Sequence, residues 1–154
     1  MQRIARLHNR IVAVAASRLA EGVALLLARF ALAGVFWRSG RSKIADGSLF
    51  EISDASRYLF ENEYAGVPLP PAIAAPLATV GEHLFPALLV IGLATRLSAG
   101  ALLAMTIVIQ IFVYPEAWWT THSLWAALAA VLIVRGGGVL SLDALIRRWR
   151  HRRA

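Results

Sequence analysis

Cysteine is absent from the 154 residues of this chain. Its absence excludes disulfide bonds, thiolate metal sites and dithiol–disulfide relays within the chain. Charged residues are also scarce, at 16% of the sequence, whereas 58% of the residues are hydrophobic and the mean hydropathy is +0.62. A soluble domain of this length would be more polar, so the composition predicts one compact membrane domain with several apolar spans.

The apolar runs divide the chain into spans and polar connections. They predict an all-α, polytopic membrane four-helix bundle over residues 19–145, with spans at about 19–40, 72–94, 99–114 and 122–134. A tight link at 95–98 and a short turn at 115–121 join the last three spans. A basic amphipathic lead-in at 1–18 precedes the bundle, and a basic tail at 146–154 follows it.

The long connection between the first two spans contains a short helical pattern of its own. Residues 52–64 place Tyr58, Leu59 and Phe60 on an apolar edge, and Ser53 or Asp54 can cap the start. We therefore expect a short amphipathic helix that lies at the membrane interface in this connection. Ser141 can cap a further short helix after the fourth span.

The distribution of basic residues indicates the orientation. The net charge is +7, but Lys and Arg gather at span edges and termini instead of on one surface, which argues against nucleic-acid binding. With both termini inside, the inner segments carry eleven Lys and Arg residues and the outer segments carry three, namely Arg41, Lys43 and Arg57. This asymmetry predicts that both termini are cytoplasmic.

Two charged residues fall near the middle of predicted spans. Arg29 and Glu82 each lie about ten residues from an end of their span, and at ~1.5 Å rise per residue their side chains reach similar depth. Unpaired charges at that depth are costly, so we predict an intramembrane Arg29–Glu82 charge pair. The pair has two interpretations: a structural clamp, or a proton carrier or ligand site at Glu82 that Arg29 tunes.

His83, beside Glu82, is a candidate metal or haem ligand. A bis-His site with His122 is hard to build, because His122 begins the fourth span about 15 Å nearer the outer surface. We therefore expect a neutral, hydrogen-bonded His83 and predict no metal site.

Polar and aromatic residues near the outer ends of the spans form a second candidate site. Thr106, Gln110 and Tyr114 follow at intervals of four on one face of the third span. With Glu82 as its floor, an outward pocket can be built from them, and it would suit a quinone or an anion. The alternative is an ordinary interface belt with snorkelling arginines. The other candidate pocket residues are Trp37, Arg38, His83, His122 and Trp125.

An ordered set of short motifs resembles a known family. The chain from Leu25 to Leu145 is similar to the DoxX/DoxD family of small four-helix bacterial inner-membrane proteins. The resemblance rests on residues 36–44 (FWRSGRSKI), 59–64 (LFENEY), 81–82 (GE), 92–96 (GLATR), 108–115 (VIQIFVYP) and 140–143 (LSLD). It implies a multi-pass protein of the bacterial inner membrane and carries over no catalytic residue.

The resemblance also bears on function. Founding members form the membrane subunit of a thiosulfate:quinone oxidoreductase, and others resemble partners in oxidative-stress complexes or neighbours of modified-peptide clusters. We therefore expect a membrane subunit of a redox or stress-linked complex that interacts with quinone and has no covalently bound cofactor. It would act with a protein partner or a second copy in the bilayer. The alternatives are a proton-linked carrier or assembly factor for a small molecule or metal-binding peptide, or a structural anchor.

Overall fold

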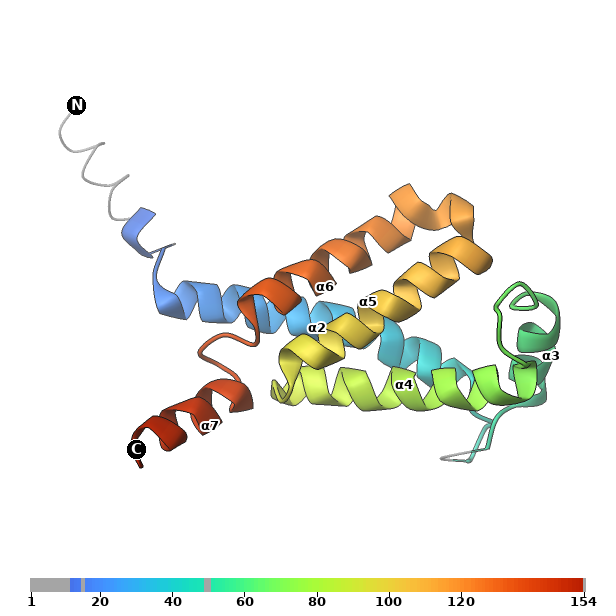
Figure 1. Cartoon of the computed structure of the whole chain (residues 1–154), viewed down its shortest axis with the longest axis horizontal. Helices are drawn as coiled ribbons and strands as arrows, with labels where there is room; N and C mark the ends of the chain where they lie inside the picture. Colours follow the sequence, from blue (N-terminus) through green and yellow to red (C-terminus); the bar gives the residue numbers. More distant parts are fainter. Residues whose placement is uncertain (1–11, 15, 49–50, 154) are drawn as a thin grey trace.

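The structure is a computed structural model that describes residues 12–14, 16–48 and 51–153. Four of its helical segments are long and apolar enough to cross a membrane: α2 (Arg18–Ser42), α4 (Pro71–Ile91), α5 (Thr95–Phe112) and the continuous segment Pro115–Arg135. The predicted all-α fold with four spans is thus confirmed (Figure 1). Most of the predicted lead-in at 1–18 lies outside the described residues.

Local sequence explains where α2 and α4 begin and end. The Ser17 hydroxyl accepts a hydrogen bond from the Ala20 amide and caps α2. Pro71 starts α4, since a first-turn proline loses no helical hydrogen bond. Gly92 ends α4 in the left-handed conformation, at φ +72°. A side chain would not fit there, since a Cβ added at position 92 would lie 2.6 Å from Cβ of Ser141.

The predicted link at 95–98 is wrong, because α5 already begins at Thr95. Residues 92–94 suffice to reverse the chain, with Gly92 and Ala94 both at positive φ. The predicted turn at 115–121 is also helical: a 3-10 turn η1 (Pro115–Ala117) and a π-helical turn η2 (Trp118–His122) lead directly into α6 (Ser123–Arg135). The fourth span is therefore longer than its apolar run.

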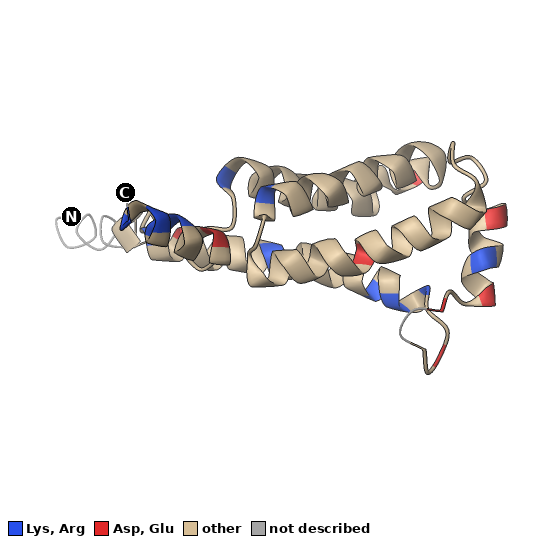
Figure 2. Cartoon of the chain, turned by 60° about the horizontal axis from the view of Figure 1, so that its bottom comes forward, with Lys and Arg blue, Asp and Glu red and all other residues tan. Residues whose placement is uncertain are grey.

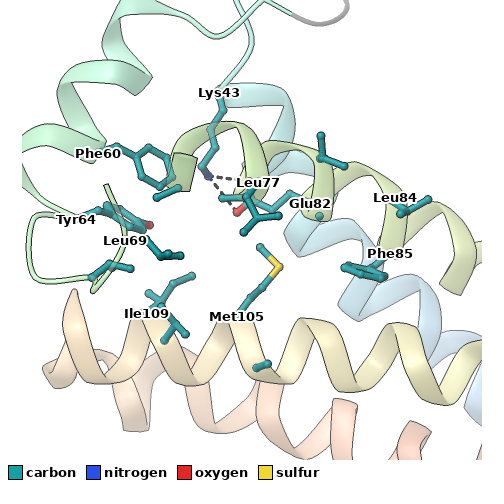
Figure 3. Close-up of a pocket in the computed structure, with 17 residues that line it drawn as sticks. Lys43, Phe60, Tyr64, Leu69, Leu77, Glu82, Leu84, Phe85, Met105 and Ile109 are labelled. Carbon is teal, nitrogen blue, oxygen red and sulfur yellow. Dashed lines mark hydrogen bonds and ion pairs between the residues drawn. The ribbon is translucent and has the colours of Figure 1, made fainter. Parts of the chain in front are cut away.

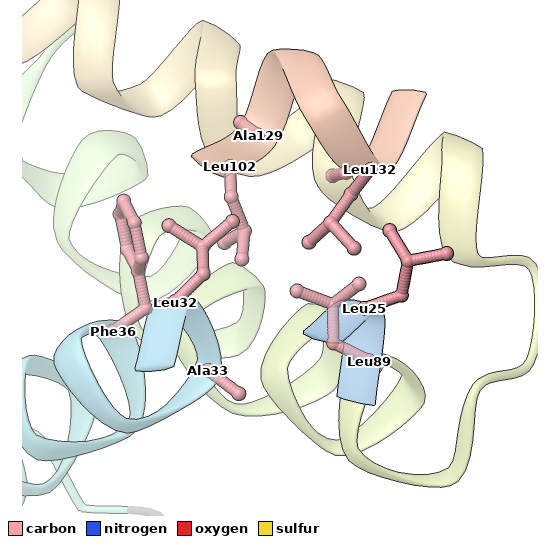
Figure 4. Close-up of a cluster of buried hydrophobic side chains, with 9 residues drawn as sticks. Leu25, Leu32, Ala33, Phe36, Leu89, Leu102, Ala129 and Leu132 are labelled. Atoms are coloured by element: carbon pink, nitrogen blue, oxygen red, sulfur yellow. The ribbon is translucent and has the colours of Figure 1, made fainter. Parts of the chain in front are cut away.

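The four long helices pack as a ring. Helix α2 contacts α4 and α6, and α5 contacts α4 and α6. The core lies between them and draws side chains from every helix (Figure 4). It contains Leu25, Leu32, Ala33, Phe36, Leu89, Ala99, Leu102, Ala129 and Leu132. Most other large apolar side chains of these helices are exposed, as expected where lipid replaces water.

The short helix predicted in the first connection is present as α3 (Asp54–Asn62), and Ser53 caps it by accepting from the Ser56 amide. Phe60 is buried against Ala74 and Ala75 of α4, so α3 lies over the start of α4. This packing places α3 at the end of the bundle opposite α7 (Figure 1). An isolated antiparallel bridge between Ile44 and Ile52 lies in the connection that precedes α3.

The last helix, α7 (Leu142–His151), begins at Ser141, whose hydroxyl accepts from the Ala144 amide as predicted. The start of α2, the end of α6 and α7 lie at one end of the bundle, where Glu21 and Arg135 form an ion pair. Figure 2 shows that charged residues gather at the two ends, with long uncharged stretches of helix between them.

Candidate functional site

The predicted Arg29–Glu82 pair is not formed. Arg29 is buried and donates four hydrogen bonds to backbone carbonyls, those of Leu89 (2.8 Å), Val90 (3.0 Å), Gly137 (2.8 Å) and Leu140 (2.9 Å). Arg29 lies 11 residues after the start of α2 yet contacts the last turn of α4, so the start of α2 extends about three turns beyond the end of α4. Figure 1 shows that the two helices are offset in this way. Arg29 and Glu82 therefore lie at different depths, because the ends of α2 and α4 are not level.

Arg29 instead belongs to a polar junction at the end of the bundle that carries α7 (Figure 1). Carbonyls of the last helical turn lack the amide of a following turn, and the guanidinium supplies donors to two of them. The Leu89 carbonyl also accepts from the Gly92 amide, at 3.1 Å. Next to it, the Asp143 carboxylate accepts from the amides of Ala94 and Thr95 at 2.8 and 2.9 Å and so caps α5. The predicted motifs at 92–96 and 140–143 therefore meet in space.

The charge of Asp143 is stabilised by this arrangement. Burial on its own would raise the pKa of the carboxyl, but the hydrogen bonds from Thr95 and Ala94 and the nearby Arg147 charge outweigh it, and the pKa is lowered. This junction is thus a set of satisfied charges that joins α2, α4, α5 and α7. Its chemistry is structural.

Glu82 lies toward the opposite end and pairs with Lys43. The Lys43 ammonium is 2.8 Å from one carboxylate oxygen of Glu82 and 3.0 Å from the other, and the Ser39 hydroxyl donates to Glu82 at 3.0 Å. Lys43 also donates to the Ser39 hydroxyl at 2.9 Å. Both charged residues are at most 5% exposed. Lys43 caps the C-terminus of α2, where a cation is favourable, and this position directs its side chain toward α4.

The Lys43–Glu82 pair forms the polar part of the wall of an otherwise apolar cavity of about 440 Å³. Figure 3 shows the cavity between α4 and α5, with aromatic side chains from the α3 region at one end. Phe60 and Tyr64 come from α3 and the following loop, and burial raises the pKa of Tyr64, so its hydroxyl is neutral. The apolar lining from α4 and α5 includes Leu77, Leu84, Phe85, Met105, Val108 and Ile109.

Comparison with known proteins identifies the family. A family model described as DoxX matches residues 24–115. The chain belongs to the DoxX family. An uncharacterized protein of Haemophilus influenzae is 33% identical over 144 residues, which cover 83% of this chain and 86% of the relative. No solved structure matches.

The predicted outward pocket is not a single site in this DoxX-family protein. Of its residues, only Glu82 lines the cavity. Gln110, His122 and Trp125 cluster between α5 and α6 instead: His122 Nδ1 is 2.7 Å from the Gln110 side-chain oxygen, and the His122 and Trp125 rings are 5.1 Å apart. Gln110 meets His122 because its side of α5 turns toward η2 and α6, which periodicity alone could not reveal.

The remaining predicted pocket residues are dispersed. Thr106 donates to the Leu102 carbonyl within its own helix at 2.8 Å, and Arg38 is exposed. The Tyr114 hydroxyl donates to Glu63, and this hydrogen bond, with burial, raises the pKa of Tyr114 to about 12. Tyr114 thereby fastens the end of α5 to the segment after α3.

His83 is held by its neighbours on α4 and α2. Its Nδ1 lies 2.7 Å from the Thr79 carbonyl, and its ring stands edge-on to Trp37 at 5.1 Å. A carbonyl can only accept, so Nδ1 carries a proton. Gly40 of α2 lets the His83 ring lie close to the α2 backbone, since a Cβ added at position 40 would lie 2.8 Å from the ring. Within the described residues, no group of three His, Cys, Asp or Glu could hold a metal ion.

Sequence reasoning missed Lys43 as the partner of Glu82. A signal was present, because Ser39 and Lys43 are four residues apart and share one face of the α2 terminus. Lys43 follows the apolar run, so the sequence alone predicts it in an external loop. The aromatic residues Phe60 and Tyr64 reach the cavity only through the fold of the first connection.

Proposed function

We propose that this DoxX-family protein binds a quinone in the cavity beside Lys43 and Glu82 and acts as a membrane subunit of a redox complex. The observation that carries the proposal is the buried ion pair in an otherwise apolar cavity between two membrane-spanning helices. An ammonium can donate to a quinone carbonyl, and a carboxylate can accept from a quinol hydroxyl. Ligand sites commonly combine an apolar lining with a few polar groups of this kind.

The position of the cavity supports a ligand that is dissolved in the bilayer. Its lining includes Leu77, Val80 and Leu84 of α4, which are 60%, 60% and 49% exposed on the side of the helix that faces lipid. A quinone ring with a hydrocarbon tail could therefore enter sideways, with the tail remaining among lipid chains. Phe60 and Tyr64 offer aromatic surfaces for the ring.

The electron donor belongs to a partner in this proposal. The chain has no cysteine, so no thiol of its own can reduce the quinone. Reduction to the quinol takes two electrons from the partner and two protons. In this proposal the Lys43 ammonium donates each proton to a ring oxygen and is reprotonated from solvent, while the Glu82 carboxylate, which accepts from Lys43 and Ser39, holds the ammonium at the cavity.

A binding experiment tests this function. The full chain in lipid nanodiscs is titrated with a short-tailed benzoquinone, and the bound fraction is measured at equilibrium. Ala104→Phe adds a ring at a residue that lines the cavity and leaves Lys43 and Glu82 unchanged, whereas the control Ala130→Phe adds the same ring to an exposed position of α6. We expect saturable binding that Ala104→Phe weakens at least tenfold and Ala130→Phe changes less than twofold. Equal binding by both variants and the unmodified chain would contradict the proposal.

A further inference from the structure

A second cavity, of about 710 Å³, lies at the end of the bundle that carries α7, remote from the cavity beside Lys43 and Glu82. It forms where the start of α2, the turn before α5, the end of α6 and the start of α7 come together. Four arginines from four different helices line it: Arg18, Arg96, Arg135 and Arg147. Its acidic residues are Glu21 and Asp143.

The acidic residues do not neutralise all four arginines. Glu21 forms its ion pair with Arg135, and the Asp143 carboxylate accepts from the Ala94 and Thr95 amides while Arg147 contributes only a nearby charge. Within the described part of the chain, Arg18 has no hydrogen-bond or ion-pair partner, and Arg147 makes no hydrogen bond. Two guanidinium groups thus remain available to an anion.

The wall between these arginines is a tightly held glycine segment. Gly136 and Gly138 have φ of +74° and +73°. A Cβ on Gly137 would lie 2.6 Å from Cβ of Ser141 and 2.7 Å from Oγ1 of Thr95, so the backbone passes directly against α5 and the start of α7. The Gly137 carbonyl is fixed by Arg29. The cavity is therefore bounded by rigid backbone on the side that faces the bundle.

The surroundings of the cavity combine this basic wall with apolar surface. Leu97, which lines the cavity, and Val134, whose carbonyl accepts from Arg96, are each 70% exposed. Trp149 of α7 is 52% exposed and carries the Arg153 guanidinium 3.7 Å above its ring. Exposed apolar side chains next to arginines are expected at the boundary between hydrocarbon and headgroups.

We propose that this cavity binds the phosphate of an anionic phospholipid. Arg18 and Arg147 would hold the phosphate oxygens, because guanidinium groups form paired, charge-assisted hydrogen bonds with phosphate. The acyl chains would lie along Leu97 and Val134. Basic pockets between membrane helices on the cytoplasmic side are suited to such headgroups. The lipid would bridge α2 and α7, which are far apart in the sequence.

The experiment uses the purified full chain in a neutral detergent. Phosphatidylglycerol, phosphatidylcholine or inorganic phosphate is added in increasing amounts, and the thermal unfolding midpoint is followed. We expect phosphatidylglycerol to raise the midpoint in a saturable way, and phosphatidylcholine and inorganic phosphate to leave it within one degree or so at the same concentration. A rise with inorganic phosphate equal to that with phosphatidylglycerol would assign the cavity to a free anion and overturn the lipid proposal.

Paired variants separate the cavity from general attraction between charges. Arg18→Gln with Arg147→Gln removes two arginines that line the cavity, whereas Arg150→Gln with Arg152→Gln removes two at the same end that do not. We measure the phosphatidylglycerol concentration that gives half of the full rise in the unfolding midpoint. We expect the first pair to raise this concentration at least tenfold and the second pair to change it less than threefold. Equal losses in both pairs would overturn the proposal.

Discussion

Buried charges in a membrane domain need partners, and Arg29 and Glu82 find them in different ways. Arg29 is satisfied by four carbonyls, whose positions are fixed by helix ends and a glycine loop. A lysine could not replace it, because its compact ammonium lacks the planar array of donors. Glu82 depends on one flexible side chain, that of Lys43, and on the Ser39 hydroxyl. The second arrangement leaves a carboxylate beside a cavity, where it can meet a ligand.

At the residue scale, the Lys43–Glu82 pair allows a test that separates bracing from binding. Glu82→Gln leaves a buried ammonium unpaired, so we expect a loss of about 3 kcal/mol in the free energy of unfolding. The double variant Glu82→Gln with Lys43→Met removes both charges and should recover most of that loss. Chemical denaturation in detergent measures both values.

The same variants are then titrated with the short-tailed benzoquinone. If the pair contacts the ligand, the double variant is stable but binds at least tenfold more weakly than the unmodified chain. A double variant that is stable and binds normally would show that the pair serves only as a brace.

At the scale of elements, α5 owes its start to a residue on another helix. Its own preceding residue, Ala94, provides no capping side chain, and Asp143 at the start of α7 performs this role. The sharp reversal after α4 therefore depends on a segment about 50 positions away in the sequence. The placement of α7 and the folding of the α4–α5 hairpin are coupled through this carboxylate.

This coupling predicts a pH-dependent loss of stability. Asp143→Ala should lower the free energy of unfolding by about 1 kcal/mol at neutral pH, the usual value of a capping side chain. Since the pKa of Asp143 is lowered in the folded protein from 3.8, its contribution is present above pH 3.8 and is lost as the pH falls through the folded-state pKa. The difference between variant and unmodified chain should therefore shrink below about pH 4 in denaturation curves.

The control for this measurement is Asp46→Ala, at an exposed position of the loop that follows α2. It should change the unfolding free energy by less than about 0.5 kcal/mol at every pH, as surface substitutions usually do. An Asp143→Ala deficit that stays constant down to pH 2 would contradict the proposed role of the carboxylate charge.

At the scale of the whole molecule, the spans place α7 and the start of α2 at one end and α3 at the other. The excess of arginine at the first end predicts that this end is cytoplasmic. Since the chain has no cysteine, single introduced cysteines can report the orientation without background.

We therefore expect Asp46→Cys to react with a membrane-impermeant thiol reagent in intact cells and His151→Cys to react only after permeabilisation. Both positions are exposed, so the difference would reflect the side of the membrane alone. Labelling of His151→Cys in intact cells, with Asp46→Cys protected, would reverse the assigned orientation.

Much of the architecture could be predicted from local patterns. The lengths of the apolar runs identified the four spans. Ser53 and Ser141 marked helix starts, because capping depends on the residues next to the helix end. The link at 95–98 was misassigned because Asp143 caps α5 from a distance, which no local pattern records. The candidate site was predicted only in part, since Glu82 was singled out but its partner and the surrounding aromatic residues were not.

The sequence by itself determined the fold class, the number of spans and the presence of buried charge, because these depend on composition and on local spacing. The tertiary structure decided which charges meet. Helices α2 and α4 are offset along their axes, which moves Arg29 to the last turn of α4 and brings Lys43 beside Glu82. Such an offset arises from packing between the helices, and neither helix encodes it alone.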